Sequence, residues 1–210
     1  RHGLAVLLPL GKLILTAFIA TLIFVCITYL PIIKLIGMKI SDYLKGAFEP
    51  WLIAFTTCSS AAALAVNLEA SRKMGASKAI ASFAIPLGNT INMNGTSIYM
   101  GVTAVFAAEV FGIDLTLAQQ FQIVLMGVLA AVGTAGVPGA GLIMTTLVFT
   151  EVGIPLEAVA LIAGIDRILD MIRTSVNVLG DSLTALVVSK SEGVLGTELM
   201  DQDTVVKEQL

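Results

Sequence analysis

The chain has 210 residues, of which 57% are hydrophobic and 13% are charged, and its formal net charge is −3. Its mean hydropathy of +0.94 lies far outside the range of soluble globular domains, so we expect an integral membrane protein. The small net charge, without a basic cluster that interleaves aromatic residues, excludes a nucleic-acid partner. The single histidine, His2, argues against a histidine-based catalytic or metal site.

The first predicted element is a transmembrane helix over residues 12–36. Residues 13–33 carry no charge and match the ~20 residues that a spanning helix needs. Pro31 is expected to end this helix, and a short amphipathic connection with three lysines follows. Because the chain starts at Arg1 with neither a methionine nor a signal peptide, we also expect it to be a fragment of a longer protein.

A re-entrant hairpin is predicted over residues 48–75. Residues 50–68 are again uncharged, yet their centre, TTCSSA at residues 56–61, is small and hydroxylated. A lipid-facing span would not carry small polar residues at mid-depth. Two half-helices that meet at a tip buried in protein can do so.

A broken helix is predicted over residues 79–110. The run GNTINMNGT at residues 88–96 contains two glycines and three asparagines, which are poor helix formers and whose amides compete for backbone hydrogen bonds. The unwound backbone would expose carbonyl oxygens near the middle of the membrane. Such oxygens are what a desolvated Na⁺ ion requires.

A second re-entrant hairpin is predicted over residues 115–152. Residues 115–150 hold no charge over thirty-six positions, which is too long for one crossing and too short for two crossings with a turn. The run GTAGVPGAG at residues 133–141 interrupts them and would form the tip. The half-helix ends at such a tip present free amide groups, which favour an anionic ligand.

The last predicted helix covers residues 156–189 and carries a polar stripe midway along an apolar segment. At about 100° per residue, the members of the stripe fall within roughly a quarter of a turn of one another. They are Asp166, Asp170, Arg173, Thr174, Asn177 and Asp181. Ionisable residues at that depth are costly unless they face a cavity, a partner or an ion, so they mark a functional site. Residues 190–210 are expected to be a polar, disordered tail in the cytoplasm.

The order hairpin, broken helix, hairpin, striped helix indicates a duplicated unit. An odd number of crossings in each copy would invert the second copy relative to the first, and secondary transporters build their sites at the interface of such repeats. The connections rich in lysine and arginine fall on one predicted side, and the acidic connections fall on the other. By the positive-inside rule, the first hairpin enters from the cytoplasm and the second from outside.

These motifs resemble the glutamate transporter family, the sodium- or proton-coupled symporters of dicarboxylates and amino acids. The matching pieces are CSS at residues 58–60, NMNGT at 92–96, GTAGVPGAG at 133–141 and the stripe on the last helix. The likeness runs from about Leu13 to the end of the chain. It implies an all-α membrane fold in which residues 1–189 form the transport domain, from the family's sixth helix to its eighth. It also implies a missing N-terminal half, which would supply the scaffold of a homotrimer.

The resemblance implies a substrate site built from both tips, the broken helix and the stripe. Its members would be Ser59, Ser60, Thr96, Val137, Gly141, Asp170, Arg173, Thr174 and Asn177. Arg173 would hold the side-chain carboxylate of aspartate or glutamate, since a guanidinium can form two parallel bonds to a carboxylate. Asp170 and Thr174 would meet the amino group, and Asn177 the α-carboxylate. The alternatives are that Arg173 only pairs with Asp170 or Asp166, and that the hydroxyl groups only pack between helices.

The resemblance also implies two cation sites, with Na⁺ or H⁺ as the coupling ion and no other cofactor. One would combine Gly88, Asn92, Asn177 and Asp181, and the other would combine Thr90 with the backbone carbonyls of Ala131, Val132 and Thr134. Carboxylate and carbonyl oxygens suit a hard cation. The family usually has an aspartate of a third cation site where this chain has Asn94, so the coupling ratio stays open.

A second departure concerns the first tip, where Cys58 stands in place of the arginine of many members. Arg167 on the last helix is expected to supply the displaced positive charge. Asp166 is expected to balance Arg167 or Arg173 and to be structural.

The sequence therefore predicts a symporter, not an enzyme, that moves aspartate or glutamate across the plasma membrane with Na⁺ or H⁺ by an elevator-like movement. A symporter of C4-dicarboxylates or of neutral amino acids is an alternative, although a neutral substrate would leave the Arg173 guanidinium unpaired. An intramembrane hydrolase is disfavoured, because no general base lies near Ser59 and Ser60 and because aspartates beside an arginine are poorly placed as a catalytic dyad. A channel is disfavoured because two hairpins would occlude it.

Overall fold

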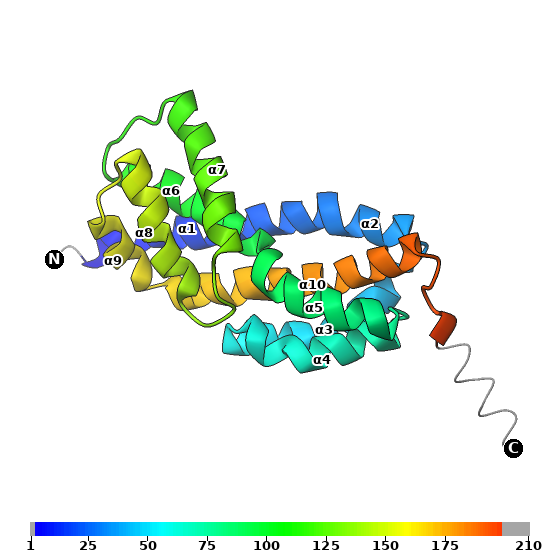
Figure 1. Ribbon diagram of the computed structural model, residues 1–210. Helices are drawn as coiled ribbons and strands as arrows, with labels where there is room; N and C mark the ends of the chain where they lie inside the picture. Colours follow the sequence, from blue (N-terminus) through cyan, green and yellow to red (C-terminus); the bar gives the residue numbers. More distant parts are fainter. Residues whose placement is uncertain (1–2, 199–210) are drawn as a thin grey trace, which may run out of the picture.

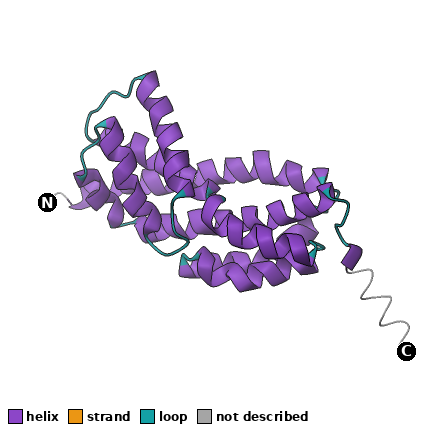
Figure 2. Ribbon diagram, viewed as in Figure 1, coloured by secondary structure: helices purple, strands orange, loops and turns teal. Residues whose placement is uncertain are grey.

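The computed structural model describes residues 3–198, and every regular element within them is helical (Figures 1 and 2). The expected all-α fold is therefore confirmed for these residues. Within the described part, one helical run, Leu8–Leu35, is long and apolar enough to cross a membrane by length and composition. Arg1, His2 and residues 199–210 of the predicted tail lie outside the described part.

The first run consists of α1 (Gly3–Phe24), a π-helical turn (Val25–Tyr29) and α2 (Leu30–Leu35). It begins well before residue 12, where the sequence analysis placed the start of the helix. Lys12 did not have to end the helix, because a long lysine stem can pack along apolar surface while its ammonium group reaches out.

Pro31 lies inside this run and does not end it, contrary to expectation. The turn before the proline widens to a π-helix, in which the Leu30 amide donates to the Val25 carbonyl. Such a turn accommodates the ring of a residue that cannot donate to the helix. The run ends instead near Gly37, which has a φ of +84°.

Two helices that pack against each other follow, α3 (Ile40–Thr57) and α4 (Ser60–Lys73). The turn between them comprises only Cys58, in a left-handed conformation (φ 57°), and Ser59, whose hydroxyl accepts from the Ala62 amide as the N-cap of α4. The pair starts at Ile40 and not at residue 48, because the amphipathic segment expected as a connection folds as the first turns of α3.

The broken helix consists of α5 (Lys78–Ile91) and α6 (Asn94–Val110). The break falls within the run of glycines and asparagines, at Asn92 (ψ 70°) and Met93 (ψ 47°), whose backbones leave the helical region. The backbone between α5 and α6 is therefore free to face α10.

A second pair of packed helices consists of α7 (Leu117–Val132) and α8 (Ala140–Val152). A capping box of Thr116 and Gln119 fixes the start of α7. The glycine-rich residues between α7 and α8 form an irregular loop, and Gly139 adopts a φ of +77° immediately before α8.

The last predicted helix is interrupted, which corrects the continuous helix expected over residues 156–189. It consists of α9 (Glu157–Ala163) and α10 (Asp166–Ser191), separated at Gly164 and Ile165, where Ile165 has a φ of −120° and a ψ of 0°. The polar stripe therefore begins at the first residue of α10. The Asp166 carboxylate lies where the positive end of the helix dipole stabilises it.

α10 is the axis of the molecule and packs against α1, α3, α4, α5, α6 and α9 (Figure 1). One apolar core surrounds its first half and includes side chains of α6, α7 and α8, such as Met100, Ile123 and Phe149. Another core surrounds its second half and includes side chains of α2 and α5, such as Ile33 and Ile85. The polar stripe crosses the region between the two cores.

The start of the predicted tail is folded and not disordered, as far as Glu198. The Gly196 amide donates to the Gly75 carbonyl (2.8 Å), and the Lys78 amide donates to Glu198 Oε1 (2.9 Å). A carboxylate at the start of a helix satisfies free amide groups and complements the helix dipole, so Glu198 fixes this segment against the beginning of α5.

Candidate functional site

A small buried cavity lies midway along α10, where the break between α5 and α6 meets the turns of both helix pairs. Its lining consists of Ser60, Met93, Thr96, Thr134, Ala135, Gly136, Val137, Gly141, Asp170, Arg173, Thr174 and Asn177. Every residue predicted to bind substrate is on this lining except Ser59. The cavity volume is about 10 Å³, roughly room for one water molecule, so a larger ligand requires the lining to move apart.

The Arg173 guanidinium is the main positive charge of the cavity and is only 4% exposed. Its Nε donates to Asp170 Oδ1 and its Nη1 donates to Asp166 Oδ1, each at 3.0 Å, while its Cζ lies 4.2 Å from the centre of the Tyr99 ring. Its Nη2 is buried without a hydrogen-bond partner in the described part of the chain. Leaving a buried donor unpaired costs about 1–3 kcal/mol, so this nitrogen favours an anionic ligand.

Asp170 connects the guanidinium to the loop between α7 and α8. Its Oδ1 also accepts from Thr174 Oγ1 (2.8 Å), and its Oδ2 accepts from the Gly139 amide (2.8 Å). Both are hydrogen bonds to a charged acceptor, which are stronger than neutral ones. A cationic group that enters the cavity would compete with Gly139 for Asp170, and this competition links the position of the loop to occupancy.

Ser59 joins the turns of the two helix pairs instead of lining the cavity. Its Oγ donates to the Gly136 carbonyl (2.9 Å), and the Ala61 amide donates to the same carbonyl (3.1 Å). Ser60 lies beside them, because a methyl group at Gly136 would overlap the Ser60 hydroxyl. The geometry therefore gives Ser59 a contact between the tips, where the sequence analysis expected a contact with substrate.

Asn177 fixes the start of α6 against α10. Its Nδ2 donates to Thr96 Oγ1 (3.0 Å) and to Met93 Sδ (3.2 Å), and its Oδ1 accepts from the Gly95 amide (2.8 Å). Thr96 and Asn177 both line the cavity, so the amide group stands at the cavity wall in a fixed orientation.

A second polar cluster surrounds Asp181, which is 2% exposed. Its Oδ1 accepts from Asn92 Nδ2 (2.8 Å), which also donates to the Asn177 carbonyl (3.1 Å). Gly88 packs so closely that a methyl group there would lie 3.0 Å from Asp181 Cγ. The structure thus brings together all four residues of the first predicted cation site.

This cluster fits a hard monovalent cation better than a transition metal. The ion pairs of residues 3–198 do not include Asp181, so its buried carboxylate lacks a positive neighbour. One carboxylate among amide and carbonyl oxygens is the ligand chemistry of hard cations. No three His, Cys, Asp or Glu side chains gather as a metal site in the part of the chain that the structure describes.

The second predicted cation site is not assembled in this structure. Thr90 is exposed, and its hydroxyl donates to the Leu87 carbonyl of its own helix (2.8 Å). Thr134 is buried, but its hydroxyl donates to Ala130 (2.9 Å) and its amide occupies the Ala131 carbonyl (2.9 Å). Val132 is exposed on α7. The oxygens expected to converge are therefore used within their own helices.

Asn94 stands in a neutral hydrogen-bond network. Its Nδ2 donates to Tyr29 Oη (3.0 Å) and to Asn92 Oδ1 (2.6 Å), and Tyr29 Oη donates to the Val176 carbonyl (3.2 Å). These bonds join the π-helical turn, the break and α10 without a charge.

Arg167 reaches the first tip, where the sequence analysis expected a displaced positive charge. Its Nη2 donates to the Thr56 carbonyl at the end of α3 (2.9 Å), and the Arg167 carbonyl lies 3.8 Å from Cys58 Sγ. A cation at the C-terminal end of a helix complements the helix dipole. Arg167 therefore stabilises the end of α3, while the buried Asp166 serves Arg173.

Sequence reasoning missed Tyr99, Gly136 and Asn89. Tyr99 lies one turn after Thr96 on the same face of α6, and that spacing could have indicated a ring beside Arg173. Gly136 has no side-chain signal, because its role is a carbonyl shared by two donors of the other tip. Asn89 also lies beside Gly136, and its Oδ1 is buried without a partner in the described residues.

Comparison with known proteins gives one family. The sodium:dicarboxylate symporter family matches residues 1–191. The proton/sodium-glutamate symport protein of Geobacillus stearothermophilus is 38% identical over 198 residues, which cover 94% of this chain and 47% of the relative. The proton/glutamate-aspartate symporter of Escherichia coli (strain K12) is 37% identical over 192 residues, which cover 91% and 44%. The C4-dicarboxylate transport protein of Bacillus subtilis (strain 168) is 38% identical over 194 residues, which cover 91% and 46%. The chain spans about half the length of these relatives.

Proposed function

Since the chain belongs to the sodium:dicarboxylate symporter family, we propose that it forms the transport domain of a secondary active symporter for aspartate or glutamate. The family consists of transporters and not of enzymes, which removes the intramembrane hydrolase from the alternatives. The observation that carries the proposal is the buried, unpaired Nη2 of Arg173 on the wall of a cavity in the middle of α10.

Substrate recognition follows from the groups around that nitrogen. A carboxylate at Nη2 would satisfy the free donor, and Asp166 and Tyr99 hold the guanidinium plane in place. The substrate ammonium would bind Asp170 Oδ2 in place of the Gly139 amide. The α-carboxylate would bind near Asn177 and the backbone of the α7–α8 loop.

An ammonium group is also what favours an amino acid over a C4-dicarboxylate. A dicarboxylate would place a second negative group near Asp170, whose carboxylate already carries three hydrogen-bond donors. A relative is nevertheless named a C4-dicarboxylate transport protein, so succinate is the competing substrate to test. A neutral amino acid would leave Nη2 of Arg173 unpaired.

Coupling to Na⁺ or H⁺ would act through Asp181. A buried carboxylate without a positive partner is unfavourable unless a cation or a proton neutralises it. Asp181 shares Asn92 with the Asn177 carbonyl, and Asn177 is part of the substrate cavity. Cation binding therefore orders the wall that the α-carboxylate would meet. The neutral network of Asn94 supports fewer cations per cycle than a chain with aspartate at that position would use.

The membrane arrangement belongs to the same proposal. The pairs α3–α4 and α7–α8 would be re-entrant hairpins that enter from opposite sides, as two halves of an inverted repeat in the plasma membrane. The remaining half of the protein would supply a scaffold that trimerises, and this transport domain would move against it like an elevator.

Uptake into proteoliposomes tests the substrate assignment. The full-length protein is assayed with labelled L-aspartate and with labelled succinate, with and without a Na⁺ gradient and a proton gradient. We expect gradient-dependent aspartate uptake, and an increase of about tenfold or more in the KM of Arg173→Lys, which keeps the charge but loses the planar fork.

Asp170→Asn is the matched variant for the amino group. We expect it to reduce aspartate uptake much more than succinate uptake, because only aspartate carries an ammonium group. Succinate uptake with an unaffected Asp170→Asn variant would instead assign a dicarboxylate. Uptake that is independent of both gradients would contradict a symporter.

A further inference from the structure

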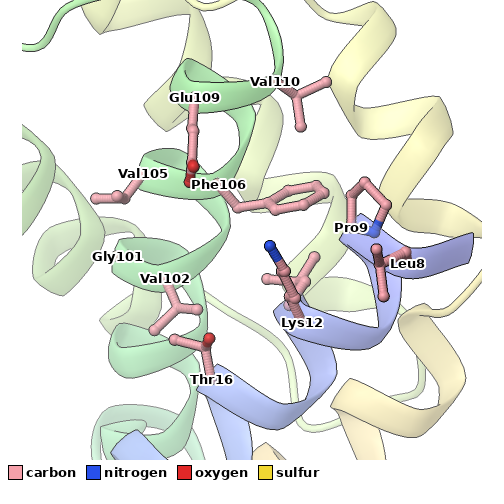
Figure 3. Close-up of a pocket in the computed structure, with 11 residues that line it drawn as sticks. Leu8, Pro9, Lys12, Thr16, Gly101, Val102, Val105, Phe106, Glu109 and Val110 are labelled. Atoms are coloured by element: carbon pink, nitrogen blue, oxygen red, sulfur yellow. The ribbon is translucent and has the colours of Figure 1, made fainter. Parts of the chain in front are cut away.

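A groove between α1 and α6 lies away from the cavity on α10 and shares no lining residue with it. Its volume is about 600 Å³, within the range of roughly 300–1,000 Å³ that is typical of ligand pockets. Figure 3 shows it with Leu8, Pro9 and Lys12 on α1 facing Phe106 and Glu109 on α6, together with Val105, Val110 and Thr16.

The long axis of the groove is apolar. Val102, Val105 and Phe106 line it on α6, and Leu13 lines it on α1. Gly101 lies at the end of the groove that is farthest from Glu109 along α6, and no atom lies within 4 Å of the place where its Cβ would be. From Glu109 to Gly101 the helix rises by about 12 Å, which is close to half of a hydrocarbon core of roughly 30 Å.

Two opposite charges stand together near the other end. The Lys12 ammonium and the Glu109 carboxylate both line the groove, and both residues are exposed. Neither takes part in an ion pair with another described residue. In Figure 3 the two side chains extend toward each other across the groove. The groove therefore offers a positive and a negative partner at its mouth and an apolar path beneath them.

We propose that this groove binds one phospholipid with a zwitterionic headgroup that carries a primary ammonium, as in phosphatidylethanolamine. The lipid phosphate pairs with Lys12, the lipid ammonium donates to Glu109, and one acyl chain lies along Val105 and Val102 down to Gly101. An anionic headgroup would meet the Glu109 carboxylate unpaired, and a trimethylated ammonium has no N–H to donate to it. The charges of the mouth thus match this headgroup better than either alternative.

The size of the groove can be changed without touching the rest of the protein. Gly101→Leu would place a side chain in open space at the end of the groove and would block the acyl chain. Gly11→Leu is the matched control, because Gly11 is also helical, also has no atom within 4 Å of its Cβ position, and is not part of the groove lining. Thr16→Trp, which fills the groove from α1, is a second blocking variant if Gly101→Leu does not fold.

Native mass spectrometry of the delipidated full-length protein in detergent measures retention of each lipid. We expect one tightly retained phosphatidylethanolamine in the wild type and in Gly11→Leu, and loss of that lipid in Gly101→Leu. Lys12→Gln and Glu109→Gln should each weaken retention by about twofold to fivefold, the change that corresponds to one exposed ion pair. Glu109→Gln should also reduce the preference over phosphatidylcholine.

Retention that is equal in Gly101→Leu and the wild type would overturn the proposal. Equal or stronger retention of phosphatidylglycerol would also overturn it, because the mouth would then select an anion. An empty groove in the wild type would show that another part of the protein covers it. None of these readouts depends on transport, so the result is independent of the substrate assignment.

Discussion

Two glycines make room for Arg173 at the centre of the cavity. A methyl group at Gly95 would lie 2.7 Å from Arg173 Cα, and one at Gly141 would lie 2.7 Å from Arg173 Cζ. These distances are shorter than any real Cβ contact. The close approach of α6 and α8 to α10 therefore depends on residues without side chains.

Gly95→Ala should lower the stability of the protein by about 1–3 kcal/mol, because the backbone of α10 cannot move aside for an added methyl group. Gly101→Ala is the control on the same helix. It meets open space and should gain about 0.5–1 kcal/mol from helix propensity. Thermal unfolding in detergent compares the two, and similar melting temperatures would contradict the packing described for Gly95.

Asn94→Asp should create a demand for a cation. Asn94 donates to Asn92 Oδ1 at 2.6 Å, and an aspartate there would set two oxygens against each other unless a cation lies between them. We expect lower stability than the wild type in Na⁺-free buffer, and a larger stabilisation by Na⁺, which reaches about 2.7 kcal/mol at one hundred times the Kd.

Asn94→Ala separates this effect from the mere loss of a hydrogen bond. It removes the same donor without adding charge, so its stability should fall without any added dependence on Na⁺. If Asn94→Asp responds to Na⁺ like the wild type in a thermal shift titration, the position does not join a cation site.

At the level of elements, one carbonyl connects the two helix pairs. The Gly136 carbonyl accepts from Ser59 Oγ and from the Ala61 amide, and Asp170 holds the same loop through Gly139. Opening of the cavity must break these bonds. Cys58 is a natural probe of opening, since it is 1% exposed at the turn next to Ser59.

Ser59→Ala should raise the rate at which a maleimide labels Cys58, in a Cys26→Ser background, by about twofold to tenfold, the equivalent of one lost hydrogen bond. Ser77→Ala removes a serine N-cap of the same kind, on α5, away from the tips. It should cost similar stability and leave the labelling rate unchanged. Equal acceleration in both variants would mean that Cys58 reports general loosening.

Arg167→Ala tests the cation at the first tip. Without the bond from Arg167 to the Thr56 carbonyl, the end of α3 loses its only cationic partner in the described part, so substrate affinity should fall. The KM for aspartate uptake measures this. An unchanged KM and an unchanged rate would show that Arg167 does not replace the missing arginine.

The sequence predicted those breaks that have a composition of their own. Asparagines and glycines at residues 88–96 and glycines at residues 133–141 mark the interruptions between α5 and α6 and between α7 and α8. The break before Asp166 and the π-helical turn before Pro31 have no such composition, because tertiary packing determines them. The cap that Glu198 provides for α5 joins residues 120 positions apart, which local patterns cannot indicate.

The candidate site was predicted to the same extent. The helical period alone brought Asp170, Arg173 and Asn177 onto one face, and the structure lines one cavity with them. The contact of Ser59 with Gly136 and the inward position of Asn89 depend on how two loops meet. Neither follows from the spacing of residues within one helix.

At the scale of the whole molecule, charge divides between the two ends of α10. The lysine-rich turns around α2, α3, α4 and α5 lie at one end of the elongated body, and the acidic turns around α6, α7, α8 and α9 lie at the other (Figure 1). The Gly196 amide joins the first end by its bond to Gly75, and Gln122 joins the second by its bond to the Glu151 carbonyl (3.2 Å). The polar cavity lies between the ends, as a membrane-spanning transporter would require.

This division predicts opposite accessibility in cells. Lys39 and Asp114 are both exposed, Lys39 before α3 and Asp114 before α7. In a cysteine-free background of the full-length protein, Asp114→Cys should react with a membrane-impermeant maleimide on intact cells, whereas Lys39→Cys should react only after lysis. Labelling of both on intact cells would place the two helix pairs on the same side, and the inverted repeat would fail. Labelling of Lys39→Cys alone would keep the repeat and reverse its orientation, because the lysine-rich end would then face outward against the charge rule.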